Sequence, residues 1–417
     1  MLLMREKERF HVSRWLRLAA ATVSMMLVGL YQYSWTLFVP HIHDFFGWPL
    51  PAIQLTFVIS TWIMTWSQPA TGFFADKRGP KFIVFFGALI TEIGWIGASY
   101  ANTLELLYLT YGLGSIGVGI FYATAIGVAN KWFPYGRGFT CGLASFGYGF
   151  GATIFNPLIS FLIPSFRFQQ TFLFMGALML IVLVTASLFI RFPSSIPEER
   201  NDEDASREKG PRDFNALGMI STWQWWLIYF AFIFTVNTGL MLSSQLTTIG
   251  DSFKISIDFV LITAALFPLT NGLGRIIGGF LSDKIGRQVA MVLYFSSQGV
   301  LSLALLWFGN VPALFVAIIV LIGLLWGANY AFFPSLIGDL YGRRNVTTNY
   351  SITYTAKAWG GILGGYVTSL LAVIYGGYAP SIMMSAAFCF ISTILVAPKI
   401  LRKPTEPTFQ GLGSKTA

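Results

Sequence analysis

The chain has 417 residues, of which 55% are hydrophobic and 11% charged, and its formal net charge at pH 7 is +9. Because soluble domains carry about 25% charged residues, this composition excludes an ordinary soluble fold and indicates a membrane protein. The excess of basic residues does not indicate nucleic-acid binding, since these residues gather at the chain ends and in alternate loops between apolar runs.

Twelve apolar runs follow one another along the chain, and each is close to the roughly 20 residues that a membrane-spanning helix needs. They cover approximately residues 16–38, 52–74, 82–100, 104–130, 138–164, 168–191, 223–250, 257–281, 289–309, 311–338, 347–374 and 378–398. The sequence therefore predicts an all-α membrane protein with twelve transmembrane helices. We expect membrane lipid to surround these helices and nucleic acid not to be a partner.

The distribution of Lys and Arg predicts the orientation in the membrane. Of 27 basic residues, 23 lie in the N-terminus, the C-terminus or alternate loops, whereas the intervening loops hold only Arg167 and Lys254. Cytoplasmic loops carry such an excess of positive charge. We therefore expect both termini in the cytoplasm and a multi-pass protein of the cell (inner) membrane. The first run lacks a clear cleavage site, which favours a retained helix over a signal peptide.

The chain is divided into two halves by one long hydrophilic stretch. This division predicts an N-terminal six-helix bundle over 1–192, a cytoplasmic linker over 193–222, and a C-terminal six-helix bundle with a short tail over 223–417. The sequence after the second run returns after the eighth run, 207 residues later, and Tyr135-Gly-Arg137 returns as Tyr341-Gly-Arg343. Two repeats at nearly one offset indicate duplication of a six-helix unit, as in many secondary transporters.

The repeated loop has the form Gly-x-x-x-Asp-Lys-x-Gly, beginning at Gly72 and at Gly279. It resembles the signature loop of the major facilitator superfamily. Glycine permits a tight turn, and the aspartate can meet a neighbouring helix end or basic residue. We therefore assign a gating role to Asp76, Lys77, Asp283 and Lys284.

Arg275 and Lys357 are the two cations that lie inside apolar runs. A cation at the bilayer centre costs at least ~2.5–3.5 kcal/mol and normally faces a polar cavity or a partner. The sequence shows no acidic mate at membrane depth on a neighbouring run, which indicates that an anionic substrate supplies the partner. Arg275 offers a planar fork for a carboxylate and Lys357 a point charge. Together they match the charge of a dicarboxylate.

Two acidic residues need separate interpretations. Glu92 lies midway in the third run, where a carboxyl is a candidate proton carrier; the alternative is that it faces a wet crevice or pairs with a nearby hydroxyl or loop cation. Asp339 lies at the end of the tenth run near Arg343 and Arg344, which suggests a structural role.

The motifs for enzyme and metal chemistry are weak. His41 and His43 fall in the first extracytoplasmic loop, and the chain has three histidines in all, so no metal site is expected. The glycines of Gly112-Leu-Gly114-Ser-Ile-Gly117 match a dinucleotide-binding pattern, but they lie inside an apolar run, which favours close helix packing. Cys141 and Cys389 are expected to be packing residues. We predict no cofactor and no enzyme.

The sequence closely resembles the oxalate/formate antiporter family of the major facilitator superfamily, most tellingly over residues 32–37, 117–122, 129–134, 271–275, 326–334 and 356–357. The resemblance implies that Arg275 and Lys357 bind the two carboxylates of oxalate. It also implies a pocket wall of Gln32, Tyr33, Tyr122, Tyr148, Trp326 and Tyr330. We complete the substrate-binding set with Asn271 and with Tyr354, which replaces a tryptophan of the family's oxalate carrier.

These observations predict a secondary active transporter of small organic anions, an oxalate/formate-type carboxylate antiporter that works by alternating access as a monomer. The alternative is proton-coupled symport of a lactate- or pyruvate-like monocarboxylate, with Lys357 or Glu92 carrying the proton. A third reading, a non-transporting receptor that senses carboxylates, is disfavoured because the chain carries no appended signalling domain.

Overall fold

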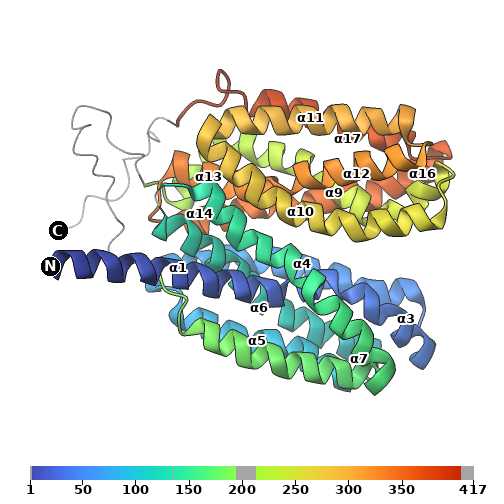
Figure 1. Cartoon of the computed structure of the whole chain (residues 1–417), viewed down its shortest axis with the longest axis horizontal. Helices are drawn as coiled ribbons and strands as arrows, with labels where there is room; N and C mark the ends of the chain where they lie inside the picture. Colours follow the sequence, from blue (N-terminus) through green and yellow to red (C-terminus); the bar gives the residue numbers. More distant parts are fainter. Residues whose placement is uncertain (1, 134, 194–212, 405–417) are drawn as a thin grey trace.

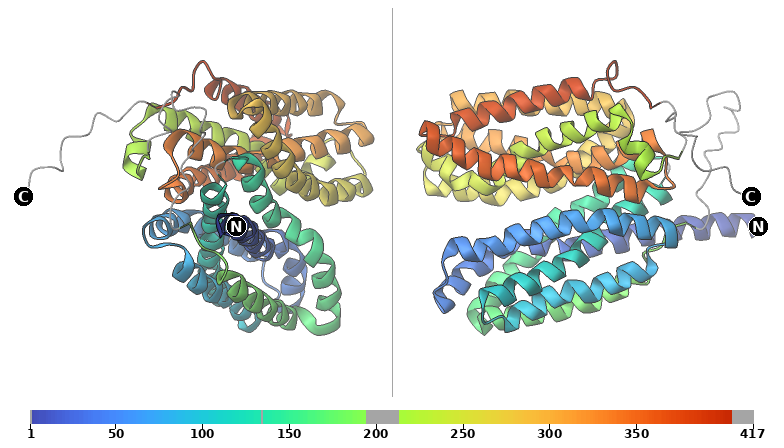
Figure 2. Two further views of the ribbon diagram at one scale, coloured as in Figure 1. Left: turned by 60° about the vertical axis from the view of Figure 1, so that its left-hand side comes forward. Right: turned by 180° about the vertical axis from the view of Figure 1, so that it is seen from behind.

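The structure is a computed structural model, and it describes residues 2–133, 135–193 and 213–404. Within these residues it is built of helices. Figures 1 and 2 show two helical bundles side by side, one from the first half of the chain and one from the second. The linker expected over 193–222 falls largely outside the described residues; near its end lies the short helix α8 (Ala216–Ile220).

The first half makes six passes. Three consecutive helices form the first pass, α7 contains two passes joined at a kink at Arg167 (φ 69°), and the others are single helices. The helices are α1 (Leu2–Val28), α2 (Leu30–Tyr33), α3 (Trp35–Phe46), α4 (Leu50–Arg78), α5 (Lys81–Tyr100), α6 (Leu104–Trp132) and α7 (Arg137–Ser187).

The second half also makes six passes, of which the tenth and eleventh in the chain are each divided into shorter helices. The helices are α9 (Trp223–Ser252), α10 (Ile257–Ile285), α11 (Arg287–Phe308), α12 (Pro312–Gly327), α13 (Asn329–Tyr341), α14 (Val346–Tyr354), α15 (Ala356–Gly361), the π-helix η1 (Ile362–Val367), α16 (Thr368–Tyr375) and α17 (Ala379–Leu395).

Helix ends follow local sequence signals. Thr103 and Thr222 cap α6 and α9 by accepting hydrogen bonds from backbone N–H groups, and Gly47 ends α3 with φ 68°. By length and hydropathy alone, eight helical stretches of the described chain suffice to cross a membrane, and α7 is counted once among them. The first pass, α4 and the 17-residue α17 complete the twelve.

One expected loop is wrong. We placed His41 and His43 in a loop, but α3 continues through Pro40 to Phe46. A proline is tolerated inside a membrane helix where neighbouring groups satisfy the freed backbone carbonyl. The His43 Nδ1 atom lies 2.7 Å from the backbone oxygen of Trp48, and no cluster of three or more metal-ligating side chains occurs among the described residues.

The two halves are joined at the end of the molecule that carries the two repeated loops, which we call the signature-loop face. Asp76 accepts hydrogen bonds from the backbone N–H and hydroxyl of Thr348, at 2.7 and 2.8 Å, at the start of α14. In the same way, Asp283 accepts from the backbone N–H groups of Gly138 and Phe139, at 3.0 and 2.8 Å, at the start of α7. Each aspartate thus meets a helix N-terminus of the other half, where negative charge is favoured.

Further ion pairs reinforce this face. Lys131 pairs with Asp76 at 2.8 Å, and Asp339 pairs with both Arg137, at 2.6 Å, and Arg287, at 2.9 Å. These two partners of Asp339 come from elements distant in sequence, whereas the sequence pointed only to the nearby Arg343 and Arg344. In the described chain, hydrogen bonds between the halves are confined to this face and to Arg275 and Lys357.

Candidate substrate site

Interrupted helices carry the residues at the centre of the molecule. The short α2 holds Gln32 and Tyr33, and the break at Ala328 separates Trp326 on α12 from Tyr330 on α13. The break at Thr355 lies between Tyr354 and Lys357, and η1 begins at Ile362, five residues after Lys357. Discontinuous helices at the repeat interface are a frequent basis of transporter binding sites, because they free backbone and side-chain groups for a ligand.

Arg275 lies on α10 between the halves and is only 1% exposed. Its guanidinium donates to the backbone oxygen of Ser145 at 2.7 Å and, through Nη2 and Nε, to the side-chain oxygen of Asn271 at 2.9 and 3.3 Å. The ring of Tyr330 lies 4.4 Å from its central carbon. These contacts fix the orientation of the guanidinium, and two of its five N–H donors have no acceptor among them.

Lys357 is 3% exposed and approaches the N-terminal half from α15. Its ammonium donates to the side-chain oxygen of Gln32 at 3.1 Å and to the hydroxyl of Tyr354 at 3.3 Å. The rings of Tyr148 and Tyr330 lie 5.9 and 6.0 Å away. Both cations are therefore held by neutral oxygens and aromatic faces.

Aromatic side chains connect the two cations. Tyr148 lies against Tyr33 and Tyr122 with ring centroids 5.8 and 5.3 Å apart, and its hydroxyl donates to Gln32 at 3.2 Å. Tyr122 and Tyr354 lie 4.6 Å apart, and Tyr330 and Trp326 5.7 Å apart. Through these contacts the structure links all ten residues of the expected substrate-binding set: Gln32, Tyr33, Tyr122, Tyr148, Asn271, Arg275, Trp326, Tyr330, Tyr354 and Lys357.

The site presents donors without acceptors. Neither Arg275 nor Lys357 forms an ion pair within the described part of the chain. The Tyr122 hydroxyl, the Trp326 indole nitrogen and the Asn271 amide nitrogen are also buried there without a hydrogen-bond partner. Buried polar groups in native proteins almost always have a partner, so this arrangement suits a small molecule rich in acceptor oxygens.

Access to the site is asymmetric. Gln32 and Tyr33 remain partly exposed, whereas the cations behind them are buried. The signature-loop face is held together by the contacts of Asp76, Asp283 and Asp339. The ribbons of the two bundles diverge toward the opposite end (Figure 1). The site is therefore closed on the side of the signature-loop face.

Glu92 lies outside this group. It is on α5, is 2% exposed, and has no hydrogen-bond partner at either carboxyl oxygen within the described residues. It packs on α7, where a Cβ added at Gly176 would lie 3.4 Å from its Oε2 atom. Nearby, the Tyr31 hydroxyl donates to the backbone oxygen of Thr91. The structure shows neither the wet crevice nor the local hydrogen bond that we weighed for Glu92.

The four residues that we expected to act in gating separate into two kinds. Asp76 and Asp283 join the halves, as described above, whereas the exposed Lys77 and Lys284 lie over Phe73 and Phe280 at 5.5 and 4.5 Å. The sequence analysis did not single out three basic residues that pair with aspartates at this face. Lys131 pairs with Asp76, Arg137 with Asp339, and Arg287 with Asp283. The repeated Tyr-Gly-Arg sequence at residues 135–137 was the signal that could have found Arg137.

Comparisons with known proteins agree with this architecture. The family profile of the Major Facilitator Superfamily matches residues 20–365 and 237–415. The chain is 33% identical to the oxalate:formate antiporter of Oxalobacter formigenes over 388 residues, which are 92% of this chain and 90% of that protein. It is 26% identical to monocarboxylate transporter 13 of Rattus norvegicus, over 78% of this chain and 74% of that protein.

Solved structures give the same fold. The transporter FucP in its outward conformation has a TM-score of 0.70 at 15% identity, covering 92% of this chain and 98% of its own. The proton:xylose symporter XylE has a TM-score of 0.70 at 11% identity, covering 94% of this chain and 97% of its own. These relatives are transporters and not enzymes. The chain is thus a multi-pass membrane protein that belongs to the Major Facilitator Superfamily and, within it, to the oxalate/formate antiporter family.

Proposed function

We propose that the protein is a carboxylate antiporter of the oxalate/formate type that works by alternating access. The observation that carries the proposal is the pair of buried cations Arg275 and Lys357, which form no ion pair within the described residues and share the ring of Tyr330. The similarity to the antiporter of Oxalobacter formigenes supports the same substrate class.

In this proposal each cation takes one carboxylate of a dicarboxylate. The two free N–H donors of Arg275 suit bidentate binding. Lys357 has one remaining proton after its bonds to Gln32 and Tyr354. The unpartnered hydroxyl of Tyr122 and indole nitrogen of Trp326 add donors at the wall. Rigid aromatic faces limit the cavity to small, flat anions.

The same charges suggest why transport is exchange. Without substrate, two like charges remain in a space of low dielectric constant, where their repulsion is stronger than in water. Closing the second side of the site around them is then unfavourable. A bound dianion cancels this charge and permits the two halves to rock to the other side. Movement of an occupied site in both directions gives exchange and little leak.

We further propose that the signature-loop face lies in the cytoplasm, that both termini lie there too, and that the membrane is the cell (inner) membrane. The distribution of basic residues supports this orientation. In this arrangement the closed face is the cytoplasmic one, so we propose that substrate enters this conformation from outside the cell. We also propose the division into bundles over 1–192 and 223–417, with one monomer as the working unit.

Proton-coupled symport of a monocarboxylate is the second candidate. Its support is Glu92, a buried carboxyl with no partner among the described residues, together with the similarity to monocarboxylate transporter 13. Here one cation binds the single carboxylate, and protonation of Glu92 or deprotonation of Lys357 balances the charge.

Uptake of labelled oxalate into proteoliposomes tests the proposal. With no ion gradient, we expect uptake into vesicles preloaded with oxalate or formate and none into empty vesicles. Lactate or pyruvate uptake that needs an inward proton gradient, with oxalate excluded, would replace exchange by symport. Vesicles made with the Arg275→Gln protein, checked for equal insertion, supply the baseline.

A further inference from the structure

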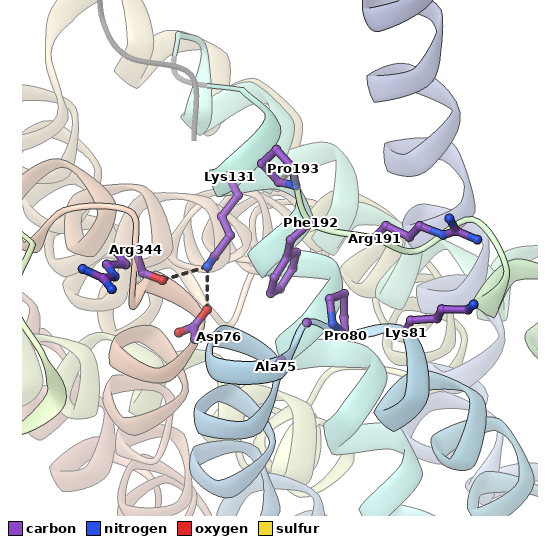
Figure 3. A pocket seen from close by; sticks show the side chains of 10 residues that line it. Ala75, Asp76, Pro80, Lys81, Lys131, Arg191, Phe192, Pro193 and Arg344 are labelled. Carbon is purple, nitrogen blue, oxygen red and sulfur yellow. Dashed lines mark hydrogen bonds and ion pairs between the residues drawn. The ribbon is translucent and has the colours of Figure 1, made fainter. Parts of the chain in front are cut away.

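A second polar pocket lies at the signature-loop face, apart from the substrate site. Its volume is about 350 Å³, and Figure 3 shows the side chains that line it. The first residues of α5, the segment after α7 and the start of the loop before α14 meet here. We call it the loop-face pocket; its residues are Ala75, Asp76, Gly79, Pro80, Lys81, Lys131, Arg191, Phe192, Pro193 and Arg344.

The acidic side of this pocket is already neutralised. Asp76 is its sole lining carboxylate; it pairs with Lys131 at 2.8 Å and accepts two hydrogen bonds from Thr348. Lys131 also donates to the backbone oxygen of Arg344 at 2.8 Å and lies 4.5 Å from the Phe192 ring. Figure 3 shows the Arg344 side chain turned away from this group. Among the residues that the structure describes at this pocket, Asp76 is therefore already paired, and no other carboxylate lines the pocket beside the remaining cations.

Lys81 and Arg191 are those remaining cations. In Figure 3 they extend on the same side of the pocket, away from Asp76. Both are exposed, and neither forms an ion pair with any residue of the described chain. Lys81 is the first residue of α5, whose N-terminus has no side-chain cap. Uncapped N–H groups at a helix start favour an anion.

A third cation lies near Arg191. Arg17 of α1 lies 4.7 Å from the ring of Trp132, and the Trp132 indole donates to the backbone oxygen of Arg191 at 2.7 Å. The Arg17 Nε atom is buried without a hydrogen-bond partner in the described part of the chain. Three separate elements thus bring to this region cations that form no ion pair within the described residues: α1, α5 and the segment after α7.

We propose that Arg17, Lys81 and Arg191 bind a phosphate group at the edge of the loop-face pocket. A tetrahedral oxyanion offers enough acceptors for two guanidinium groups, one ammonium and the α5 N-terminus together. The ligand is either free phosphate or the phosphodiester of an anionic lipid, because the same donors recognise both. This site is separate from the carboxylate site at Arg275 and Lys357 and does not depend on what is transported there.

Thermal unfolding of the purified full-length protein tests the site in two arms at constant ionic strength. In lipid-free detergent, inorganic phosphate is titrated against chloride. In nanodiscs, phosphatidylglycerol is compared with phosphatidylcholine. The test variant is Arg17→Gln/Lys81→Gln/Arg191→Gln. The matched control, Lys399→Gln/Arg402→Gln/Lys403→Gln, removes three cations that are exposed near the end of the described chain.

We expect the native protein and the control to be stabilised in at least one arm, and the test variant to need at least about tenfold more ligand, as loss of charge-assisted hydrogen bonds implies. A response to phosphatidylglycerol alone identifies a lipid headgroup, and a response to inorganic phosphate identifies a soluble ligand. Equal responses of the two variants, or no response of the native protein in either arm, would overturn the proposal.

A third variant tests whether the chain's own acidic run occupies the site. In this variant Glu198, Glu199, Asp202, Glu203 and Asp204 are replaced by the corresponding amides. If phosphate stabilises the protein only after this neutralisation, the three cations serve the linker and the proposed phosphate site is wrong. If the native protein responds as strongly as this variant, the proposal stands.

Discussion

The guanidinium of Arg275 lies over the ring of Tyr330, with its central carbon 4.4 Å from the ring centroid. Lys357 approaches the same ring from the eleventh pass, at 6.0 Å. One tyrosine thus contacts two cations that have no ion-pair partner in the described chain. An aromatic face stabilises a cation without cancelling its charge, so the pair stays available for an anion.

The position of Tyr330 also ties the site to the fold. It follows directly after the break between α12 and α13, and its other neighbour is Trp326, on the far side of that break. A change in the angle between these two helices would move the ring against both cations. We therefore expect substrate binding and rearrangement of the tenth pass to be coupled through this side chain.

Replacing Arg275 by Gln should abolish carboxylate transport while leaving membrane insertion intact. The change removes a buried positive charge, and a neutral amide is easier to bury. Loss of two charge-assisted hydrogen bonds should lower uptake by at least about 100-fold. Uptake is measured in proteoliposomes with protein amounts matched by immunoblot. Arg402→Gln, which replaces an exposed arginine of the same half of the chain, is the control, and robust uptake by Arg275→Gln would contradict the assignment.

Replacing Lys357 by Gln should separate dicarboxylates from monocarboxylates. Arg275 remains and can hold one carboxylate, whereas the second carboxylate of oxalate loses its counter-charge. We expect oxalate exchange to fail and some formate or lactate exchange to persist. Competition of each anion against labelled substrate measures the change in preference. Equal loss for both substrate classes would show that Lys357 has no role specific to the second carboxylate.

The passes and the two cations inside them could be predicted because their signals are local. Arg275 and Lys357 are the two cations inside apolar runs, and this needs no knowledge of the fold. The partner of Asp339 could not be found in this way. Arg137 is 202 residues distant from it, and the sequence drew attention only to the nearby Arg343 and Arg344. Pairing across the two halves depends on packing, which no local pattern encodes.

Replacing Glu92 by Gln distinguishes exchange from symport. Gln keeps the shape of the buried side chain but cannot release or take up a proton. If the protein is an antiporter, oxalate exchange should change by less than about twofold, since Glu92 touches none of the substrate-site residues in the contacts described above. If it is a symporter, uptake should lose its dependence on an inward proton gradient. Uptake at matched internal pH, with and without that gradient, measures the difference.

Replacing Asp283 by Asn should weaken the closed signature-loop face. The carboxylate holds the N–H groups of Gly138 and Phe139 and pairs with Arg287 at 2.5 Å. An amide keeps one acceptor oxygen and loses the charge, and hydrogen bonds to charged groups contribute about 1.5–3 kcal/mol. The population with this face open should therefore rise about tenfold or more.

Cys141 can report this opening. It is buried on α7 near Asn130, next to Gly142, whose added Cβ would meet the backbone of Arg275 in the other half. In a Cys389→Ser background, we expect N-ethylmaleimide to label Cys141 about tenfold faster in Asp283→Asn than in the parent. Asp251→Asn removes an exposed carboxylate at the end of α9 and should leave the rate unchanged. Identical labelling of all three proteins would mean that Asp283 does not control the closure, and Asp76 and Asp339 would have to hold it.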